Sequence, residues 1–307
     1  MILINNEIDQ KIWNKLVDNK IFYRYEWIFV TKNIYKFEPY FVLLVEGDKF
    51  ALIASFKTHK GYISLPFVSY SGFFANDENM LLKLKEYLRT QNIVIDSRDL
   101  VNKVVTRGYV NPIVSISSYE TFWRSLSTNT RNQFKKSTNF NYKFIEENSI
   151  NNFYKLYSNG MRNLGTPVHG KDYFINLMKS FSFKVFTIFD NNVAIGSMFC
   201  LSDKDTMAVL YAYVLPEYSK KYANYFLYLN SIKWMTKIGL IYLDMGRSNY
   251  GEGTFHFKKK FRPKFYAIKS NINYDDNTKL QVASSIWKKL PLSIANFIGP
   301  KIRRYLP

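Results

Sequence analysis

Cysteine is almost absent from the sequence. The single thiol, Cys200, lies in an apolar run that is typical of a strand. One cysteine cannot form a disulfide within the chain, and a thiol in such a run is most simply a buried side chain. The cysteine content fits a reducing compartment, so we expect the protein in the cytoplasm.

Acidic residues are also scarce. The 307 residues include 43 Lys and Arg against 24 Asp and Glu, which gives a formal net charge of +19. A balance this basic indicates an anionic partner: nucleic acid, a phosphorylated sugar nucleotide or lipid, or an anionic membrane surface. The composition argues against disorder, because 47% of the residues are hydrophobic and 18% are aromatic.

Long hydrophobic runs and several common motifs are missing. No apolar run approaches the roughly 20 residues of a membrane-spanning helix, and the opening MILINNEID lacks the flanks of a signal peptide. We therefore expect a soluble protein, or one that is peripheral at the inner face of the membrane. There is no G-x-S-x-G elbow and no Walker-type loop, which argues against hydrolases and P-loop enzymes. His59, His169 and His256 are scattered and form no HxxxH pair, so we expect no metal.

The predicted elements follow a similar order in the two halves. Each half runs through short helices, an antiparallel meander, a helix and a strand. Hairpins are predicted at residues 40–56, around Gly47, and at residues 183–201, around Asp190-Asn191-Asn192. The sequence therefore predicts an α/β (α+β) protein with domains at 1–118 and 119–276 and a basic tail at 277–307.

Residues 222–262 combine the features of a substrate site. Apolar residues recur at three- and four-residue spacing from 222 to 235, which predicts an amphipathic helix, and Gly239 can end it with a positive φ. A short apolar strand follows at 240–245, then a glycine loop at 246–253 and the cationic run FHFKKKFR. This order indicates a site that holds a phosphorylated substrate at the end of a strand.

Several segments are similar to one family. FHFKKKF resembles the FK-x-x-F/W element of the FemAB-like branch of the GNAT superfamily, and DMGRSNYGEGTFHFK resembles the D-x-G-R-S…G-T-x-x-F-K block of its BioF2-like acyltransferases. The similarity extends over most of the chain and is greatest to members associated with exopolysaccharide gene clusters. It is carried further by YEWIFVTKNIYKFEPYFVLLVEGDKFALIASF, SLPFVSYSGFFAN, FYKLYSNGMRNLGTPVHGKDYF and LPLSIANFIGPKIRRYLP. The resemblance implies two tandem GNAT-like domains with mixed, mostly antiparallel sheets flanked by helices, the second domain being the more complete.

The resemblance also implies an activity. Family members transfer an acyl or aminoacyl group to an amine of a cell-envelope precursor, with acyl-CoA or aminoacyl-tRNA as donor. Two departures concern that donor. The acyl-CoA signature R/Q-x-x-G-x-G/A is replaced by SKKYAN at 219–224, which has no glycine that would let the backbone wrap a pyrophosphate. The long charged helical arm of some tRNA-dependent members is missing as well, so both donors stay open.

The matched block contains the residues to which we assign chemistry. Acyl transfer to an amine needs a proton acceptor and donors that face the developing oxyanion. Asp244 is the predicted proton acceptor; the alternative is a structural carboxylate that caps loop amides or pairs with Arg247. Lys258, the lysine of the FK element, is predicted to contact a phosphate or the oxyanion. Arg247 offers a fork for phosphate or carboxylate, and Tyr211 is a candidate donor to the carbonyl or a core residue.

Other residues are assigned to substrate binding. Arg131 and Lys135 are predicted to meet a diphosphate; the alternative is a solvated helix face. The resemblance places His169 beside the acceptor cleft, and a loop histidine without a catalytic part is the alternative. The remaining assignments come from the glycine loop, its continuation and the start of the preceding helix: Ser248, Gly251, Thr254 and Asn224.

The tail at 277–307 has no acidic residue. Its cations are Lys279, Lys288, Lys289, Lys301, Arg303 and Arg304, and one helical face carries Leu280, Ala283, Ile286, Trp287 and Leu290. A basic helix with Trp at its apolar edge can lie on an anionic membrane. The alternative is a terminal helix docked on the body of the protein.

These observations predict an N-acyltransferase or aminoacyltransferase of the FemAB-like type, which needs no metal. Its acceptor would be a phosphorylated or lipid-linked sugar or peptide of peptidoglycan, capsule or exopolysaccharide. tRNA would be a partner if it carries the donor group, and we infer no stable protein partner. Two alternatives stay open: an acetyl-CoA-dependent N-acetyltransferase of a sugar or small amine, and a non-catalytic protein that binds RNA or a membrane through its charge.

Overall fold

The computed structural model describes residues 1–18, 20–103, 106–270 and 278–306, without the side chains of 278–282. The first part of the chain forms a six-stranded sheet. Its strands are β1 (Ile2–Ile4), β2 (Glu38–Glu46), β3 (Lys49–Thr58), β4 (Gly61–Ser64), β5 (Phe73–Ala75) and β6 (Ile95–Asp96). Its helices are η1 (Asn5–Glu7), α1 (Gln10–Val17), η2 (Ile21–Tyr23), α2 (Trp27–Tyr35) and α3 (Glu78–Thr90). The strands run in the order β1-β2-β3-β4-β6, with β5 also paired to β3, and the predicted hairpin is β2–β3.

The rest of the chain forms a nine-stranded sheet. Its strands are β7 (Arg98–Val101), β8 (Tyr109–Ser115), β9 (Lys143–Glu147), β10 (Ser182–Asp190), β11 (Val193–Asp203), β12 (Thr206–Val214), β13 (Tyr242–Asp244), β14 (Ser248–Asn249) and β15 (Lys264–Ser270). Its helices are α4 (Tyr119–Ser125), α5 (Thr128–Ser137), α6 (Asn151–Leu164), α7 (Lys171–Ser180), α8 (Pro216–Ser219), α9 (Ala223–Lys237) and α10 (Gly253–Lys259). The strand order is β7-β15-β8-β13-β12-β11-β10-β9, with β14 paired to β8.

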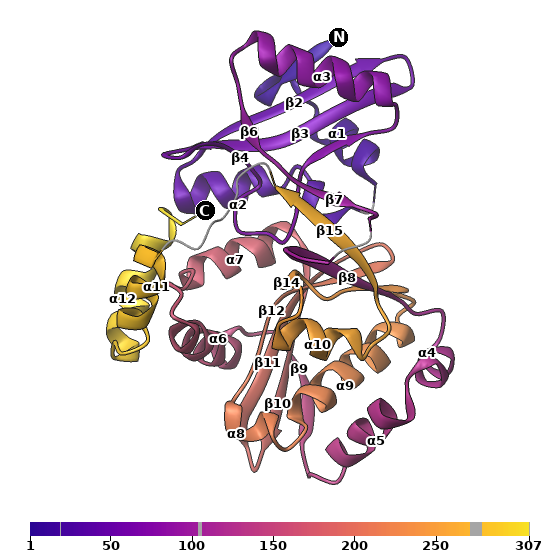
Figure 1. The fold of residues 1–307 in the computed structure, drawn as a ribbon, viewed down its shortest axis with the longest axis vertical. Helices are drawn as coiled ribbons and strands as arrows, with labels where there is room; N and C mark the ends of the chain where they lie inside the picture. The colour runs from indigo at the N-terminus through magenta and orange to yellow at the C-terminus, as the bar shows by residue number, and fades with distance from the viewer. Residues whose placement is uncertain (19, 104–105, 271–277, 307) are drawn as a thin grey trace.

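Both sheets are mixed. The β4–β6 and β12–β13 pairs are parallel, whereas the other strand pairs are antiparallel. Helices flank both sheets (Figure 1), so the predicted α/β class with mostly antiparallel mixed sheets is confirmed. Sheet membership changes between Asp96 and Arg98, and β7 and β8 therefore pair in the second sheet, although they precede the predicted boundary at 118. An extended segment can pair with either sheet, so local sequence could not assign these strands; the boundary itself stays a prediction.

One hydrophobic core joins the two units. The cluster that contains Trp27 of α2 also contains Phe174 of α7 and Phe199 of β11, and all three side chains are buried. The ring centroids of Trp27 and Phe181 lie 4.9 Å apart. Apolar contact of this extent holds the two sheets in a fixed relation, which fixes the walls of any cavity between them.

The C-terminal helices α11 (Thr278–Trp287) and α12 (Leu292–Arg303) pack beside α6, at the left in Figure 1. Trp287 and Ala295 are buried. Gly299 is buried as well, and a Cβ on it would lie 2.8 Å from Val168 Cγ2, so only glycine allows this approach. The structure thus shows the docked alternative for the tail. Leu280 of the predicted apolar face lies outside the described side chains, and none of the described helices has the length and apolar character needed to cross a bilayer.

Candidate active site

A split in the second sheet creates the site. The parallel strands β12 and β13 pair only from Thr206 to Ala208 and then separate, so the later half of β12 has no described neighbour strand on that side. A bulge in the β11–β12 register between Phe199 and Cys200 also lies in this half. Gly246 follows β13 with a φ of +71°, and a Cβ there would lie 3.0 Å from the Val209 carbonyl oxygen. A glycine is therefore required where the strands part.

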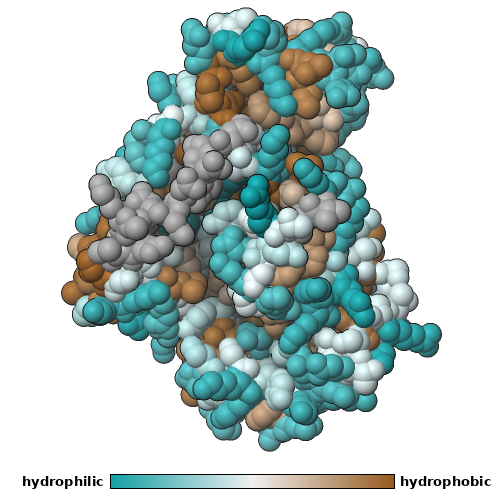
Figure 2. All heavy atoms as spheres, viewed as in Figure 1, coloured by the Kyte–Doolittle hydropathy of each residue, from teal (hydrophilic) through white to brown (hydrophobic). Residues whose placement is uncertain are grey.

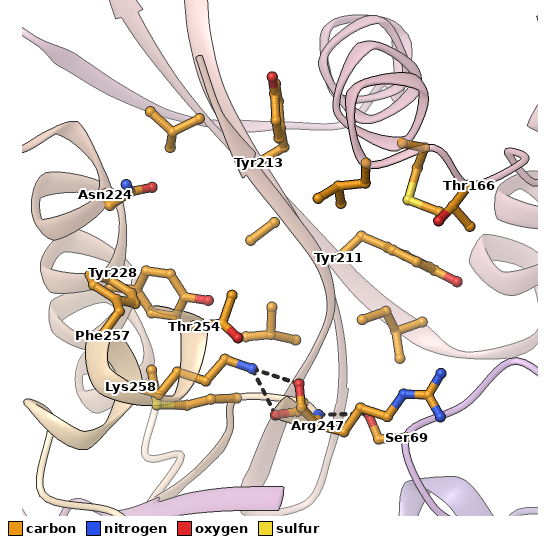
Figure 3. A pocket seen from close by; sticks show the side chains of 18 of the residues that line it. Ser69, Thr166, Tyr211, Tyr213, Asn224, Tyr228, Arg247, Thr254, Phe257 and Lys258 are labelled. Atoms are coloured by element: carbon orange, nitrogen blue, oxygen red, sulfur yellow. Dashed lines mark hydrogen bonds between the residues drawn. The ribbon is translucent and has the colours of Figure 1, made fainter. Parts of the chain in front are cut away.

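The split opens into a pocket of about 650 Å³. Its walls come from β12, the loop after β13, α6, α9, α10, the loop before β5 and the end of α12 (Figure 3). The polar and charged side chains on these walls are Ser69, Thr166, Tyr211, Tyr213, Ser219, Asn224, Tyr228, Arg247, Thr254, Lys258 and Arg303. Three of them are cations, and the described lining includes no Asp or Glu. The pocket is therefore electrostatically suited to an anionic ligand.

Asp244 lies behind the pocket wall rather than on it. Its Oδ1 accepts hydrogen bonds from Asn111 Nδ2 (2.9 Å) and the Gly246 amide (2.8 Å), and its Oδ2 accepts one from the Tyr70 hydroxyl (3.0 Å). Burial raises the pKa of this carboxyl group, while these hydrogen bonds and the charge of Lys258 act to lower it. The contacts match the structural alternative, a carboxylate that caps a loop amide, and the described ion pairs do not join Asp244 to Arg247.

Lys258 lies on the pocket wall and is 8% exposed. Its Nζ donates hydrogen bonds to the backbone carbonyls of Gly246 (2.8 Å) and Arg247 (3.1 Å), as Figure 3 shows. Burial lowers the pKa of Lys258 to about 8, although the nearby carboxylate of Asp244 raises it. The ammonium group therefore ties α10 to the loop after β13 and supplies positive charge to the pocket.

Arg247 and Tyr211 also line the pocket; their contact with a substrate stays a prediction. In Figure 3 both side chains extend toward the same side. The Arg247 guanidinium carbon lies 5.1 Å from the ring centroid of Tyr109, and the Arg247 amide donates to Ser69 Oγ (3.2 Å). Burial raises the pKa of Tyr211, against the charges of Arg303 and Arg247, so its hydroxyl stays protonated and can donate a hydrogen bond.

The other predicted residues divide into two groups. Thr254 and Asn224 line the pocket, and Asn224 Nδ2 donates to Ser219 Oγ (3.0 Å). Ser248 and Gly251 do not line it: Ser248 is buried on β14, and Gly251 is exposed with a φ of +81°. Within the glycine loop, Gly246, Arg247 and Gly253 therefore reach the pocket, whereas Ser248 and Gly251 do not.

His169, Arg131 and Lys135 lie outside the pocket lining. His169 is fully buried directly behind Arg303, whose Nε donates to His169 Nε2 (3.3 Å). Lys135 is exposed and borders a separate surface hollow with Lys136 and Tyr222. Arg131 lies on the same helix, α5, and contacts Thr128.

Sequence reasoning missed two side chains that the structure brings to the pocket. Tyr228 lies on α9, and its hydroxyl points into the pocket in Figure 3; burial raises its pKa, so it remains protonated. Periodicity indicated a helix here but could not distinguish a core tyrosine from a pocket tyrosine. Arg303 was assigned only to a basic tail, because its role depends on how α12 docks.

Residues 124–259 match the sequence family described as the acetyltransferase (GNAT) domain. This segment contains the split strands, α9, α10 and most of the pocket wall, so the part of the chain that is similar to the GNAT domain is the part that forms the pocket. No curated protein sequence matches the chain.

Solved structures share the fold over most of its length. The crystal structure of FemX is 12% identical with a TM-score of 0.64, over 84% of this chain and 94% of that one. L-PGS from Bacillus licheniformis is 11% identical with a TM-score of 0.54, over 92% and 98%. A tandem GNAT protein from the clavulanic acid biosynthesis pathway is 5% identical with a TM-score of 0.52, over 90% and 99%. The predicted tandem GNAT-like fold is thereby confirmed, and the nine-stranded second unit is the more complete.

Proposed function

We propose that this chain is an N-acyltransferase or aminoacyltransferase of the FemAB-like type that modifies an amine of a cell-envelope precursor. One observation carries the proposal: the opening between β12 and β13 is a pocket with three cations and no described carboxylate on its wall. Such a pocket can hold an anionic reactant while the free edge of β12 offers backbone groups to it. The fold shared with FemX and the motif resemblance support the same activity.

The proposed reaction has a simple balance. The neutral acceptor nitrogen attacks the donor carbonyl carbon, a C–N bond forms, and the ester or thioester bond to the donor breaks. The Tyr228 hydroxyl donates a proton to the departing oxygen or sulfur, and the proton lost by the nitrogen returns to it through water. Lys258 stabilises the oxyanion, since its charge is held at the pocket wall by two carbonyls. Asp244 acts as a positioning residue that holds Gly246 and Tyr70.

The donor is bound at the start of α9 in this proposal. Asn224 in the first turn of α9 lines the pocket, and Tyr222, which precedes the helix, borders the neighbouring hollow with Lys135 and Lys136. Tyr222 adopts a φ of +59°. We assign these lysines to the phosphates of acyl-CoA or of aminoacyl-tRNA, because exposed cations bind phosphate chains without needing a glycine loop.

The outer face of the tail supports peripheral contact with an anionic membrane. Ile286, Ile294 and Phe297 are exposed there, 61%, 46% and 69% respectively. Exposed cations accompany them: Lys288, Lys289, Lys301 and Arg304. Brown and teal atoms lie together on the left edge of Figure 2, where Figure 1 places these helices. A face of this kind suits the inner surface of an anionic bilayer, and it would bring the pocket to lipid-linked precursors.

The experiment that tests the proposal is transfer in vitro. The purified protein is incubated with an envelope-precursor extract and either acyl-CoA or charged tRNA, and products are identified by mass. Lys258→Met should lower the rate by about 100-fold, whereas Lys259→Met, at the exposed neighbouring lysine, should leave it unchanged. Product with acetyl-CoA alone would establish the acetyltransferase alternative. No product from any donor, with RNA or vesicle binding that weakens steeply with salt, would establish the non-catalytic one.

A further inference from the structure

Arg303 is held in a defined orientation at the end of the docked tail. Its Nε donates to His169 Nε2 (3.3 Å), and its guanidinium carbon lies 5.2 Å from the ring centroid of Phe67. These two contacts fix the plane of the guanidinium group. The described ion pairs include none with Arg303, so its two terminal NH₂ groups have no carboxylate partner in the described part of the chain.

His169 is itself held in a fixed position, and it orients Arg303 by accepting its hydrogen bond. Its ring stacks on Tyr173 with centroids 4.3 Å apart, its Nδ1 contacts the Tyr35 hydroxyl, and its amide donates to the Tyr157 hydroxyl (3.0 Å). Burial, together with the charge of Arg303, lowers the pKa of His169 well below its usual value, so the ring is neutral. Because Arg303 Nε must donate, we assign the ring proton to Nδ1 and the lone pair to Nε2. A fully buried histidine in a tyrosine cage thus orients one pocket cation.

A second arginine converges on the same place. Arg303, Arg247 and Tyr211 line the same pocket, and the charges of both arginines act to lower the pKa of the Tyr211 hydroxyl. Arg247 reaches the pocket from the loop after β13 and Arg303 from α12, so two distant parts of the chain meet there. Two guanidinium groups in one pocket whose described lining has no carboxylate repel each other, and a bound anion relieves this repulsion.

We infer that Arg303 and Arg247 bind one phosphate or diphosphate group of the acceptor across the Tyr211 hydroxyl, and that docking of α12 completes this subsite. Guanidinium groups give paired hydrogen bonds to phosphate oxygens, and the protonated hydroxyl adds a third donor. The tail is then a part of the substrate site as well as a membrane-facing element. Only the identity of the ligand as an acceptor rests on the proposed function; binding of the anion does not.

The test measures binding rather than transfer. Inorganic pyrophosphate is titrated into the full-length protein at physiological salt by calorimetry. The dissociation constant should rise at least tenfold in Arg303→Gln and in Arg247→Gln, and should stay unchanged in Arg304→Gln, an exposed neighbour whose guanidinium carbon lies 5.3 Å from the Tyr305 ring centroid. Arg303→Lys should recover only part of the affinity. Equal affinities of Arg303→Gln and Arg304→Gln would overturn the inference.

A second variant tests the role of the tail without changing Arg303. Gly299→Val keeps Arg303 but blocks the contact of α12 with Val168, so it should lose pyrophosphate binding to the same degree while the core still unfolds cooperatively. Unchanged affinity in this variant would reject the role of the tail. Titration with a nucleoside diphosphate sugar and with a detergent-solubilised polyprenyl diphosphate then shows which source depends on Arg303. If no acyl donor gives product but Arg303 still governs pyrophosphate binding, the transferase proposal fails and the anion subsite stands.

Discussion

At the scale of single residues, Lys258 is unusual because it is a charged side chain that is buried. Its neighbours are two backbone carbonyls and, farther away, the carboxylate of Asp244, which is itself buried. Desolvation acts on both groups in the direction of their neutral forms, so each has its pKa moved toward neutrality. A buried lysine and a buried carboxylate whose pKa values are both shifted toward neutrality, one on a pocket wall and one behind it, are typical of functional sites.

The lowered pKa of Lys258 has a consequence for stability. The folded lysine loses its proton near pH 8, whereas in the unfolded chain it does so near about 10.4. Between these values the unfolded state binds more protons, so the free energy of unfolding contributed by this group rises with pH. We expect the wild type to gain stability relative to Lys258→Met between pH 8 and 9.5, measured by urea unfolding. A difference that is flat or falls with pH would contradict the assigned pKa.

Tyr228 offers a test of the proton donor. Tyr228→Phe removes the hydroxyl but keeps the ring, which packs against Phe257 and Phe261. We expect kcat to fall by about 100-fold, in the range of general acid catalysis, with little change in KM or in the thermal midpoint. Steady-state kinetics check this, and the matched change Tyr225→Phe, on the same helix but outside the pocket lining, should keep kcat near the wild-type value. A normal kcat in Tyr228→Phe would remove this residue from the mechanism.

The FK motif located Lys258 from sequence, and the same block located Arg247 and Thr254. The sequence could not assign Tyr228 and Arg303 to the pocket. Local patterns do not show which side of α9 faces a cavity, and they do not show where the C-terminal helices dock. For Asp244 the sequence could place the carboxylate at the end of a strand, but it could not show that three hydrogen bonds occupy its oxygens.

At the scale of elements, the segment after the glycine loop shows most clearly how the structure differs from the sequence interpretation. It was interpreted as a cluster of charge, and the structure shows a helix, α10, that buries Phe255 and Lys258 while Lys259 stays exposed. Alternation of aromatic and basic residues is compatible with a short helix whose inner face includes a lysine. The charge count alone could not reveal which lysine turns inward.

The C-terminal helices carry a prediction of their own. Phe297→Glu places a carboxylate on the exposed face of α12, beside Lys301, whose Nζ lies 4.3 Å from the ring centroid of Phe297. We expect partitioning to vesicles with anionic lipid to fall by about tenfold or more, because apolar contact is lost and charge attraction is weakened. Vesicle sedimentation measures this, and Val94→Glu, an exposed apolar site on the first unit, serves as the control. Equal binding of the two variants would rule out the tail as the docking face.

At the scale of the whole molecule, the order of elements predicted an α/β protein and the family resemblance implied two units with mixed sheets; this predicted fold is confirmed. Pairing between distant strands was beyond local sequence: β7 and β15 meet through residues 98–101 and 267–270. The single core that includes Trp27 and Phe174 also depends on contacts that no periodicity reports. These long-range contacts bring the loop before β5, the split strands and the tail to one pocket.

The most direct test of the central claim compares envelope precursors from cells that contain the protein, lack it, or carry Lys258→Met. Mass spectrometry of precursors and glycans should show one species heavier by an acyl or aminoacyl group in the first cells and absent from the other two. Identical precursor masses in all three would contradict acyl transfer by this pocket.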